Sequence, residues 1–205
     1  MGRIAIALGT WLLSASAARA EVSSTDRLII DVITASGTGC PGNVNIEVHP
    51  DQAGFDIHYS SLTAMVGVGA SPVDFRKICQ LTLLVHVPAG FNLDIDRAEL
   101  RGFTSLATGA TGQVRSSFAV ASISPLTFVA QSFSGPFDED WMFSEVIDHT
   151  AVVLPCRSQP GKLVLTTEVR VAAGTSDPTT TTSLIAVEGF GLGGASYRVS
   201  FPFCS

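Results

Sequence analysis

Hydrophobic and polar residues alternate along most of this chain with the period of two that is typical of β-strands. Residues 44–48 and 55–59 alternate most clearly, and the turn-forming residues between them predict a β-hairpin. Further strands are predicted at residues 28–33, 81–87, 91–95, 114–122, 126–133, 151–154, 163–171, 183–187 and 197–203. The run 81–87 is nearly all apolar, so we expect that strand to be covered on both faces.

Helical periodicity is absent from every stretch of ten or more residues in the mature part of the sequence. One short helical turn is predicted where Ser71 could cap, Pro72 suits the first helical position and Asp74 favours the helix N-terminus. Short strands separated by Gly, Pro and Ser turns predict an all-β fold, a single-domain antiparallel β-sandwich.

The first twenty residues have the layout of a secretory signal peptide. A basic start with Arg3 precedes an apolar run, and Ala18-Arg19-Ala20 is a small-x-small cleavage signal. We therefore expect residues 1–20 to be removed and residues 21–205 to form one secreted, extracellular domain. Its 185 residues are enough for a sizeable core.

An even number of cysteines in an exported chain predicts disulfides. The four are Cys40, Cys79, Cys156 and Cys204, which allow three connectivities. Their spacing favours local pairing, Cys40 with Cys79 and Cys156 with Cys204. We therefore expect two disulfides to cross-link the sandwich. A zinc site is the alternative, but the sequence has no C-x-x-C motif to support it.

The charge balance argues against polyanionic partners. The formal net charge is −6, and it becomes −8 when Arg3 and Arg19 leave with the leader. The basic pairs Arg76-Lys77 and Arg97…Arg101 are too few for a polyanion patch. We expect no nucleic-acid partner and no membrane insertion.

An acidic tripeptide, Asp138-Glu139-Asp140, follows Gly135-Pro136 and is predicted to lie in a turn. With Asp148 and backbone carbonyls it could hold calcium, which takes six to eight oxygen ligands. A solvated acidic turn is the alternative, and the sequence favours it, so no cofactor is expected apart from this calcium hypothesis. The neighbouring Trp141 and Phe143 are candidates for an exposed aromatic contact, although burial in the core is the favoured interpretation.

Two other groups of polar residues could carry chemistry. Glu47 and His49 share one strand face and Asp56 and His58 share another, so a metal site would form if these faces coincide. The row Asp94, Asp96 and Glu99 offers carboxylates at a spacing that glycoside hydrolysis permits. A solvated strand face explains both groups equally well, and we favour it.

The remaining motifs are weaker. The segment 189–194 contains G-x-G-x-x-G, but an alternating strand pattern follows it where a nucleotide site needs a helix. Asp148 and His149 are adjacent, so on a strand they would point to opposite faces and form no catalytic pair.

Several short motifs are spread over almost the whole mature chain: Gly37-Thr38-Gly39-Cys40-Pro41, Arg76-Lys77-x-Cys79, Pro88-x-Gly90-Phe91, Arg101-Gly102, Gly135-Pro136, Pro155-Cys156, residues 163–171 and Cys204. Together they resemble the signatures of the family of secreted proteins called domain of unknown function 4360. One difference is Ile78, which stands where the family usually has Asn. The resemblance implies a small exported protein of fungal or bacterial type with this cysteine layout. It implies no established activity and no catalytic residues.

These observations favour a secreted, non-catalytic binding or structural module whose partner is a cell-wall component, the matrix or another exported protein. A secreted hydrolase with a carboxylate-based site is one alternative. A protease inhibitor is another, acting through a rigid loop at residues 179–182 or 189–194.

Overall fold

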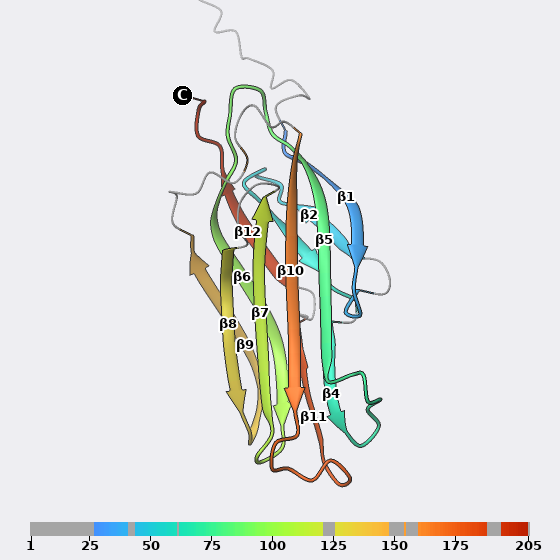
Figure 1. Ribbon diagram of the computed structural model, residues 1–205. Coiled ribbons are helices and arrows are strands. Elements are labelled where there is room, and N and C mark those ends of the chain that lie inside the picture. Colours follow the sequence, from blue (N-terminus) through green and yellow to red (C-terminus); the bar gives the residue numbers. More distant parts are fainter. Residues whose placement is uncertain are drawn as a thin grey trace, which may run out of the picture.

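Every regular element of this protein is a β-strand in the segments that the computed structural model describes, residues 27–40, 44–60, 62–120, 126–147, 154, 160–187 and 194–204 (Figure 1). The strands are β1 (Ile29–Ser36), β2 (Asn45–Val48), β3 (Gly54–His58), β4 (Thr63–Gly67), β5 (Arg76–His86), β6 (Asp94–Leu106), β7 (Thr111–Val120), β8 (Leu126–Ser134), β9 (Phe137–Val146), β10 (Gly161–Ala172), β11 (Thr182–Ala186) and β12 (Ala195–Ser200). The predicted all-β class is confirmed. In the same segments no helix has the length and hydropathy needed to cross a membrane.

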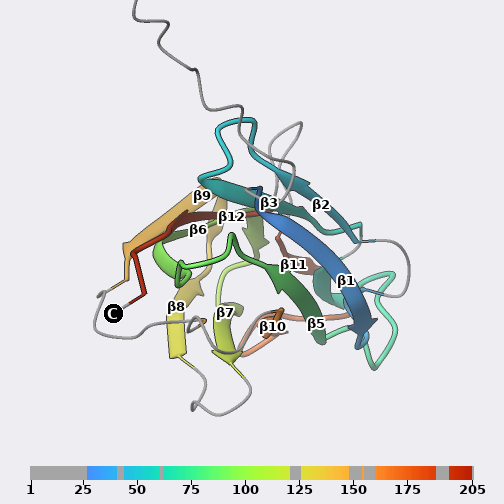
Figure 2. The same ribbon diagram turned by 90° about the horizontal axis from the view of Figure 1, so that it is seen from above.

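Two antiparallel sheets lie against each other (Figure 2). The first is five-stranded, in the order β1-β5-β10-β7-β8. The second is seven-stranded, in the order β2-β3-β12-β6-β11-β4, with β9 paired to β6. The thirteen-residue β6 pairs with β12 along its first half and with β11 along its second half.

Residues that point inward from both sheets form one apolar core. On β5, Leu81, Leu83 and Val85 are at most 1% exposed, whereas Thr82 and Leu84 between them are partly exposed. The prediction that this strand is covered on both faces is therefore wrong. Nothing in the described residues packs over its outer face, so only its alternate residues are buried.

A buried polar network crosses the core between the sheets. Tyr59, which follows β3, has its hydroxyl 3.1 Å from the Thr167 Oγ1 atom of β10. The Ser116 hydroxyl of β7 lies 2.8 Å from that same Thr167 oxygen. Burial raises the pKa of Tyr59 to about 12, although the hydrogen bond with Thr167 acts in the opposite direction. Tyr59 therefore stays protonated and able to donate a hydrogen bond.

The disulfide Cys40–Cys79 joins the segment after β1 to the middle of β5. The two Cα atoms lie 5.2 Å apart, and the cysteines are 4% and 1% exposed. Beside them the Gly39 amide donates a hydrogen bond to the Ile78 carbonyl oxygen at 2.8 Å. The first of the two predicted cysteine pairs is confirmed.

Most predicted strands are present, but the sequence analysis failed in several places. Strands β4 and β9 were not predicted, and neither was most of β6, whose first two residues alone fall in the strand predicted at 91–95. The helical turn at Ser71 is wrong: the Asp74 amide donates to the Ser71 carbonyl oxygen at 2.9 Å, and the Ser71 amide donates to the Asp74 carboxylate at 2.9 Å, which closes a single turn. Because β5 begins at Arg76, no space is left for a helix.

Some predictions fall outside the described residues. They concern the signal peptide at residues 1–20, most of the strand predicted at 151–154, and Cys156, the predicted partner of Cys204. Leu154 is described, and it forms an isolated β-bridge with Leu93. One disulfide is seen in the described segments, and the second stays a prediction.

The double substitution Cys40→Ala/Cys79→Ala should lower the free energy of unfolding by about 3–4 kcal/mol. The disulfide closes a loop of sequence separation 39, and its loss restores that loop's entropy to the unfolded chain. Thermal unfolding measures the effect, and for a chain of this size the melting temperature should fall by roughly 10 °C.

Reductant provides the control. Reduced wild-type protein should melt at or below the temperature of the double variant. A further fall when the variant itself is reduced would indicate the second disulfide. A variant that melts like the oxidised wild-type protein would contradict the role assigned to Cys40–Cys79.

Candidate functional site

The outer face of the second sheet is polar where β3, β12 and β6 run side by side. The antiparallel register sets Asp56, Ser196 and Glu99 in one row across these three strands. Their neighbours along the strands, among them Tyr197 and Leu100, are fully buried in the core. Side chains alternate between the two faces of a strand, so burial of one set directs the other set to solvent.

Strand β6 supplies the centre of this polar face. Arg97, Glu99 and Arg101 alternate with Ala98 and Leu100, which are both 0% exposed. Glu99 and Arg101 are on the same face and form an ion pair, with side chains 17% and 30% exposed. The pair therefore fixes the Arg101 guanidinium close to the sheet.

The pairing of β6 with β12 sets the positions of two arginines and becomes irregular just beyond them. Arg198 lies opposite Arg97, but the next residue, Val199, lies opposite Ile95, so Asp96 is an extra residue on β6. Such a bulge shifts the alternation of side chains along its strand. The pairing before the bulge is regular, from Ala195 opposite Leu100 to Arg198 opposite Arg97, and this regular register places the two arginines directly opposite each other.

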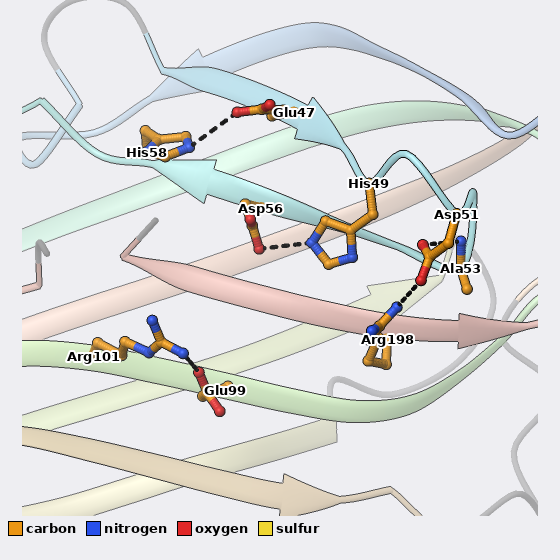
Figure 3. A network of polar contacts seen from close by, with 9 residues as sticks. All are labelled: Glu47, His49, Asp51, Ala53, Asp56, His58, Glu99, Arg101 and Arg198. Atoms are coloured by element: carbon orange, nitrogen blue, oxygen red, sulfur yellow. Dashed lines mark hydrogen bonds and ion pairs between the residues drawn. The ribbon is translucent and has the colours of Figure 1, made fainter. Parts of the chain in front are cut away.

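The loop between β2 and β3 contributes a carboxylate to the same face (Figure 3). Asp51 accepts a hydrogen bond from Arg198 Nη1 at 2.6 Å and another from the Ala53 amide at 3.0 Å. Arg198 and then the Ala53 amide hold the pKa of Asp51 below its ordinary value. The Arg198 side chain is half exposed, and this contact orients it.

Two histidine–carboxylate pairs lie beside these groups (Figure 3). His49 Nε2 is 3.0 Å from Asp56 Oδ1, and His58 Nε2 is 3.9 Å from Glu47 Oε2. Glu47 pairs with Asp56 across β2 and β3, so the two faces proposed from the sequence do coincide. Even so, the described residues include no group of three or more His, Cys, Asp or Glu side chains arranged to hold a metal ion.

Gly54 allows the His49 ring to lie against the sheet. A Cβ atom at this position would come within 2.5 Å of His49 Nδ1 and 2.4 Å of the Tyr197 carbonyl oxygen. Both separations are far below contact distance, so only glycine fits here. The local sequence therefore directs His49 towards Asp56 and the strands beyond it.

Together these side chains enclose a shallow cleft of about 350 Å³. Its lining is entirely polar or charged: His49, Arg97, Glu99, Arg101, Ser196 and Arg198. Three guanidinium groups thus face one carboxylate, although the chain as a whole has a formal charge of −6. The lining side chains alone carry an excess of positive charge, but Asp51 and Asp56 beside the cleft pair with Arg198 and His49, and Glu99 pairs with Arg101.

Two donor groups of the cleft are not engaged. Arg97 is exposed and forms no ion pair with any described residue, whereas Arg101 and Arg198 each have a carboxylate partner. The Arg101 Nε atom is buried without a hydrogen-bond partner. Arg97 is therefore available to a ligand, whereas the buried Arg101 Nε atom is not accessible to one.

The acidic tripeptide is not in a turn, so that prediction is wrong. Asp138, Glu139 and Asp140 lie exposed on β9, where they pair with residues of β6. On a strand, neighbouring side chains point to opposite faces, so the three carboxylates do not converge. Asp148 lies outside the described residues, and the calcium hypothesis stays a prediction.

The aromatic candidates belong to the core, which was the favoured interpretation. Trp141 is 8% exposed, and its indole Nε1 donates a hydrogen bond to Thr104 Oγ1 at 2.9 Å. Phe143 is partly buried, and its ring centroid lies 5.3 Å from that of Trp141 and 6.0 Å from that of Phe133. Neither residue belongs to the lining of the cleft.

The predicted row of three carboxylates is not formed as expected. Asp94 is 6% exposed, Asp96 accepts a hydrogen bond from Ser200 Oγ at 2.7 Å, and Glu99 alone reaches the cleft. The bulge at Asp96 causes this difference, because it interrupts the alternation that the sequence analysis assumed.

The structure describes one of the two candidate inhibitor loops in full and only the last residue of the other. In the loop that includes residues 179–182, Asp177 accepts hydrogen bonds from the Thr179 amide at 2.9 Å and the Thr179 hydroxyl at 2.7 Å. The Thr181 amide also donates to the Asp177 carbonyl oxygen at 3.0 Å. These bonds fold the loop back on itself. Residues 189–193, like Asp148 and His149, lie outside the described residues.

Sequence reasoning missed the cleft although it noted most of its residues. Arg97 and Arg101 were considered only as an isolated basic pair, and Arg198 was not considered. The signal that could have found them is the pattern Arg97-x-Glu99-x-Arg101, in which charged residues alternate with Ala98 and Leu100.

Fold and site together define a disulfide-bonded protein of two antiparallel sheets with a charged cleft on one outer face. The chain belongs to the family described as "Domain of unknown function (DUF4360)", whose model matches residues 26–201. The resemblance inferred from the sequence is confirmed.

One curated relative is an "Uncharacterized secreted protein" of Arthroderma benhamiae, 29% identical over 150 residues. The match covers 72% of this chain and 61% of the relative, so the chain spans less than two thirds of the relative's length. The relative is secreted, and a buried disulfide is typical of oxidising compartments. The predicted secreted, extracellular location is confirmed.

Two solved structures show distant similarity. One is TmCBM61 in complex with beta-1,4-galactotriose, with 13% identity, a TM-score of 0.32, and coverage of 80% of this chain and 87% of the other. The second is the enzymatically active domain of tailspike protein 4 of bacteriophage CBA120, with 10% identity, a TM-score of 0.23, and coverage of 87% and 20%. TM-scores this low establish neither a shared fold nor a shared ligand.

The substitution Asp56→Asn should lower the free energy of unfolding by about 1 kcal/mol at neutral pH. Burial raises the pKa of Asp56, but hydrogen bonds from Ser196 and His49 outweigh it and leave the pKa below the ordinary 3.8. A lowered pKa stabilises the fold above the unfolded value, and this stabilisation disappears as pH falls through the folded value. The difference from wild type should therefore shrink as the pH falls below 3.8.

Urea unfolding at neutral pH and at about pH 2.5 measures this difference. Asp31→Asn is the matched control, because Asp31 also faces a histidine, His86 at 3.3 Å, but its side chain is 62% exposed. The control should cost less at neutral pH. An Asp56→Asn penalty that is the same at both pH values would contradict the ionised contact.

Proposed function

We propose that this secreted protein is a binding module without chemistry of its own, and that the cleft on the outer face of the second sheet is its binding site. The observation that carries the proposal is the cleft itself, in which six polar or charged side chains line one hollow. We also propose that a second disulfide, Cys156–Cys204, stabilises the secreted fold.

The contacts of the cleft favour binding because they hold its side chains in place before a ligand arrives. Asp51 orients Arg198, Glu99 orients Arg101, and Asp56 orients His49. Long side chains that are already ordered lose little conformational entropy when a ligand binds. The strands beneath them add rigidity, since sites on strands are more precise than sites on loops.

A carboxylate-based hydrolase fits the same residues less well. Glycoside hydrolysis needs one carboxylic acid that holds its proton near neutral pH, which requires a raised pKa. Asp56 has a lowered pKa, so it is not suited to act as the general acid. Glu99 is held in an ion pair with Arg101, and no second carboxylate is among the lining residues.

An inhibitor loop is also less well supported. The loop that contains Asp177 is closed by its own hydrogen bonds and is tied to its surroundings, because the Thr175 amide donates to the Gly109 carbonyl oxygen at 3.1 Å. A loop folded on itself offers little extended backbone to a protease. We therefore favour the cleft as the functional surface, with a wall or matrix component as its partner.

The substitution Ser196→Trp should abolish binding of the partner. Ser196 lies in the middle of the cleft between Asp56 and Glu99, so an indole there would occupy the space of the ligand. The matched control is Thr166→Trp on β10, a partly exposed position on the outer face of the first sheet.

Retention on insoluble wall and matrix fractions is the measurement, with melting temperature as the test of folding. Wild type and Thr166→Trp should be retained, and Ser196→Trp should pass through. If Ser196→Trp is unstable, Arg198→Ala replaces it, since Arg198 is half exposed. Equal retention of all the variants would place the binding site elsewhere, and no retention of wild type on any fraction would contradict the proposed function.

A further inference from the structure

We infer that the ligand of this cleft is an acidic saccharide, a sugar chain that bears carboxylate groups, and that Arg97 contacts the carboxylate. This inference rests on the proposed function and adds the chemical class of the ligand. Its starting point is the pair of arginines that face each other across β6 and β12.

Arg97 lies directly opposite Arg198 in the register of the two strands. Like charges at directly opposed positions destabilise a sheet. Arg198 is compensated by Asp51 at 2.6 Å, whereas Arg97 has no carboxylate partner among the described residues. An anion bound between the two guanidinium groups would remove this repulsion, and a planar carboxylate matches the fork of guanidinium donors.

The other carboxylates near the cleft are already engaged. Glu47 faces His58, Asp56 faces His49, and Glu99 faces Arg101. Arg97 therefore forms no ion pair with any described carboxylate.

A saccharide fits the lining better than an acidic peptide does. Protein and peptide interfaces depend on a desolvated centre with apolar or aromatic anchors. No apolar side chain is among the lining residues. The Ser196 hydroxyl, the His49 imidazole and the Glu99 carboxylate instead offer donors and acceptors for sugar hydroxyl groups. The volume of about 350 Å³ is within the range of small-ligand sites.

The test compares sugars that differ only in charge. Oligomers of glucuronic acid and of galacturonic acid are titrated into the purified protein by calorimetry, next to glucose and galactose oligomers of the same length and linkage. A poly-glutamate peptide of similar charge is the third probe. At least one acidic oligomer should bind tenfold or more tightly than its neutral counterpart, and more tightly than the peptide.

Three variants identify the contact. Arg97→Gln should weaken binding of the acidic oligomer roughly tenfold or more, because it removes a charge-assisted hydrogen bond. Arg97→Lys keeps the charge without the planar fork, so its loss should be intermediate. Lys162→Gln removes one positive charge from an exposed position on β10 of the first sheet and should leave binding unchanged.

Several results would overturn the inference: neutral oligomers that bind as tightly as the acidic ones, tighter binding of the peptide, no binding of any acidic oligomer, or an Arg97→Gln affinity equal to that of wild type. Failure here is distinct from failure of the proposed function. If wall fractions still retain wild type but not Ser196→Trp, the cleft binds another class of ligand.

Discussion

The backbone pairing of β6 is the constraint on which the rest of this structure depends. This strand pairs with β12 and β11 on one side and with β9 on the other, so it connects the parts of the second sheet (Figure 1). Its inner residues, such as Leu100, are fully buried against the first sheet, which forces Arg97, Glu99 and Arg101 to the outer face. Opposite faces of this one strand therefore contribute to the hydrophobic core and to the candidate site.

Strand pairing also explains why the polar side chains of the outer face are arranged as a site. Charges that belong to different strands reach one another only because the register fixes which residues are opposed: Arg198 meets Arg97, and Asp56 meets Ser196. Gly54 lets His49 lie close to the sheet, and Asp51 anchors Arg198 from a loop. The resulting arrangement pairs its carboxylates with cationic side chains and leaves Arg97 without an ion pair among the described residues, which suits recognition of an anion better than acid–base catalysis.

Local patterns were sufficient to predict much of the fold. The alternation at residues 44–48 and 55–59 gave β2 and β3, and cysteine spacing gave the Cys40–Cys79 pair. Strand β9 was missed because its acidic start after Gly135-Pro136 is typical of a turn, yet pairing with β6 provides its hydrogen bonds. The cleft was missed for a non-local reason: Arg198 is brought beside Arg97 by strand pairing. A single sequence does not contain this pairing.

The most direct test of the central claim is an NMR titration of isotopically labelled protein with an acidic oligosaccharide, in which backbone amide and arginine Nε signals are followed. The account predicts that the largest shift changes fall on the outward-facing residues of β3, β6 and β12, with the Arg97 Nε signal among them. Changes confined to the outer face of the first sheet, or to the loop that contains Asp177, would contradict it.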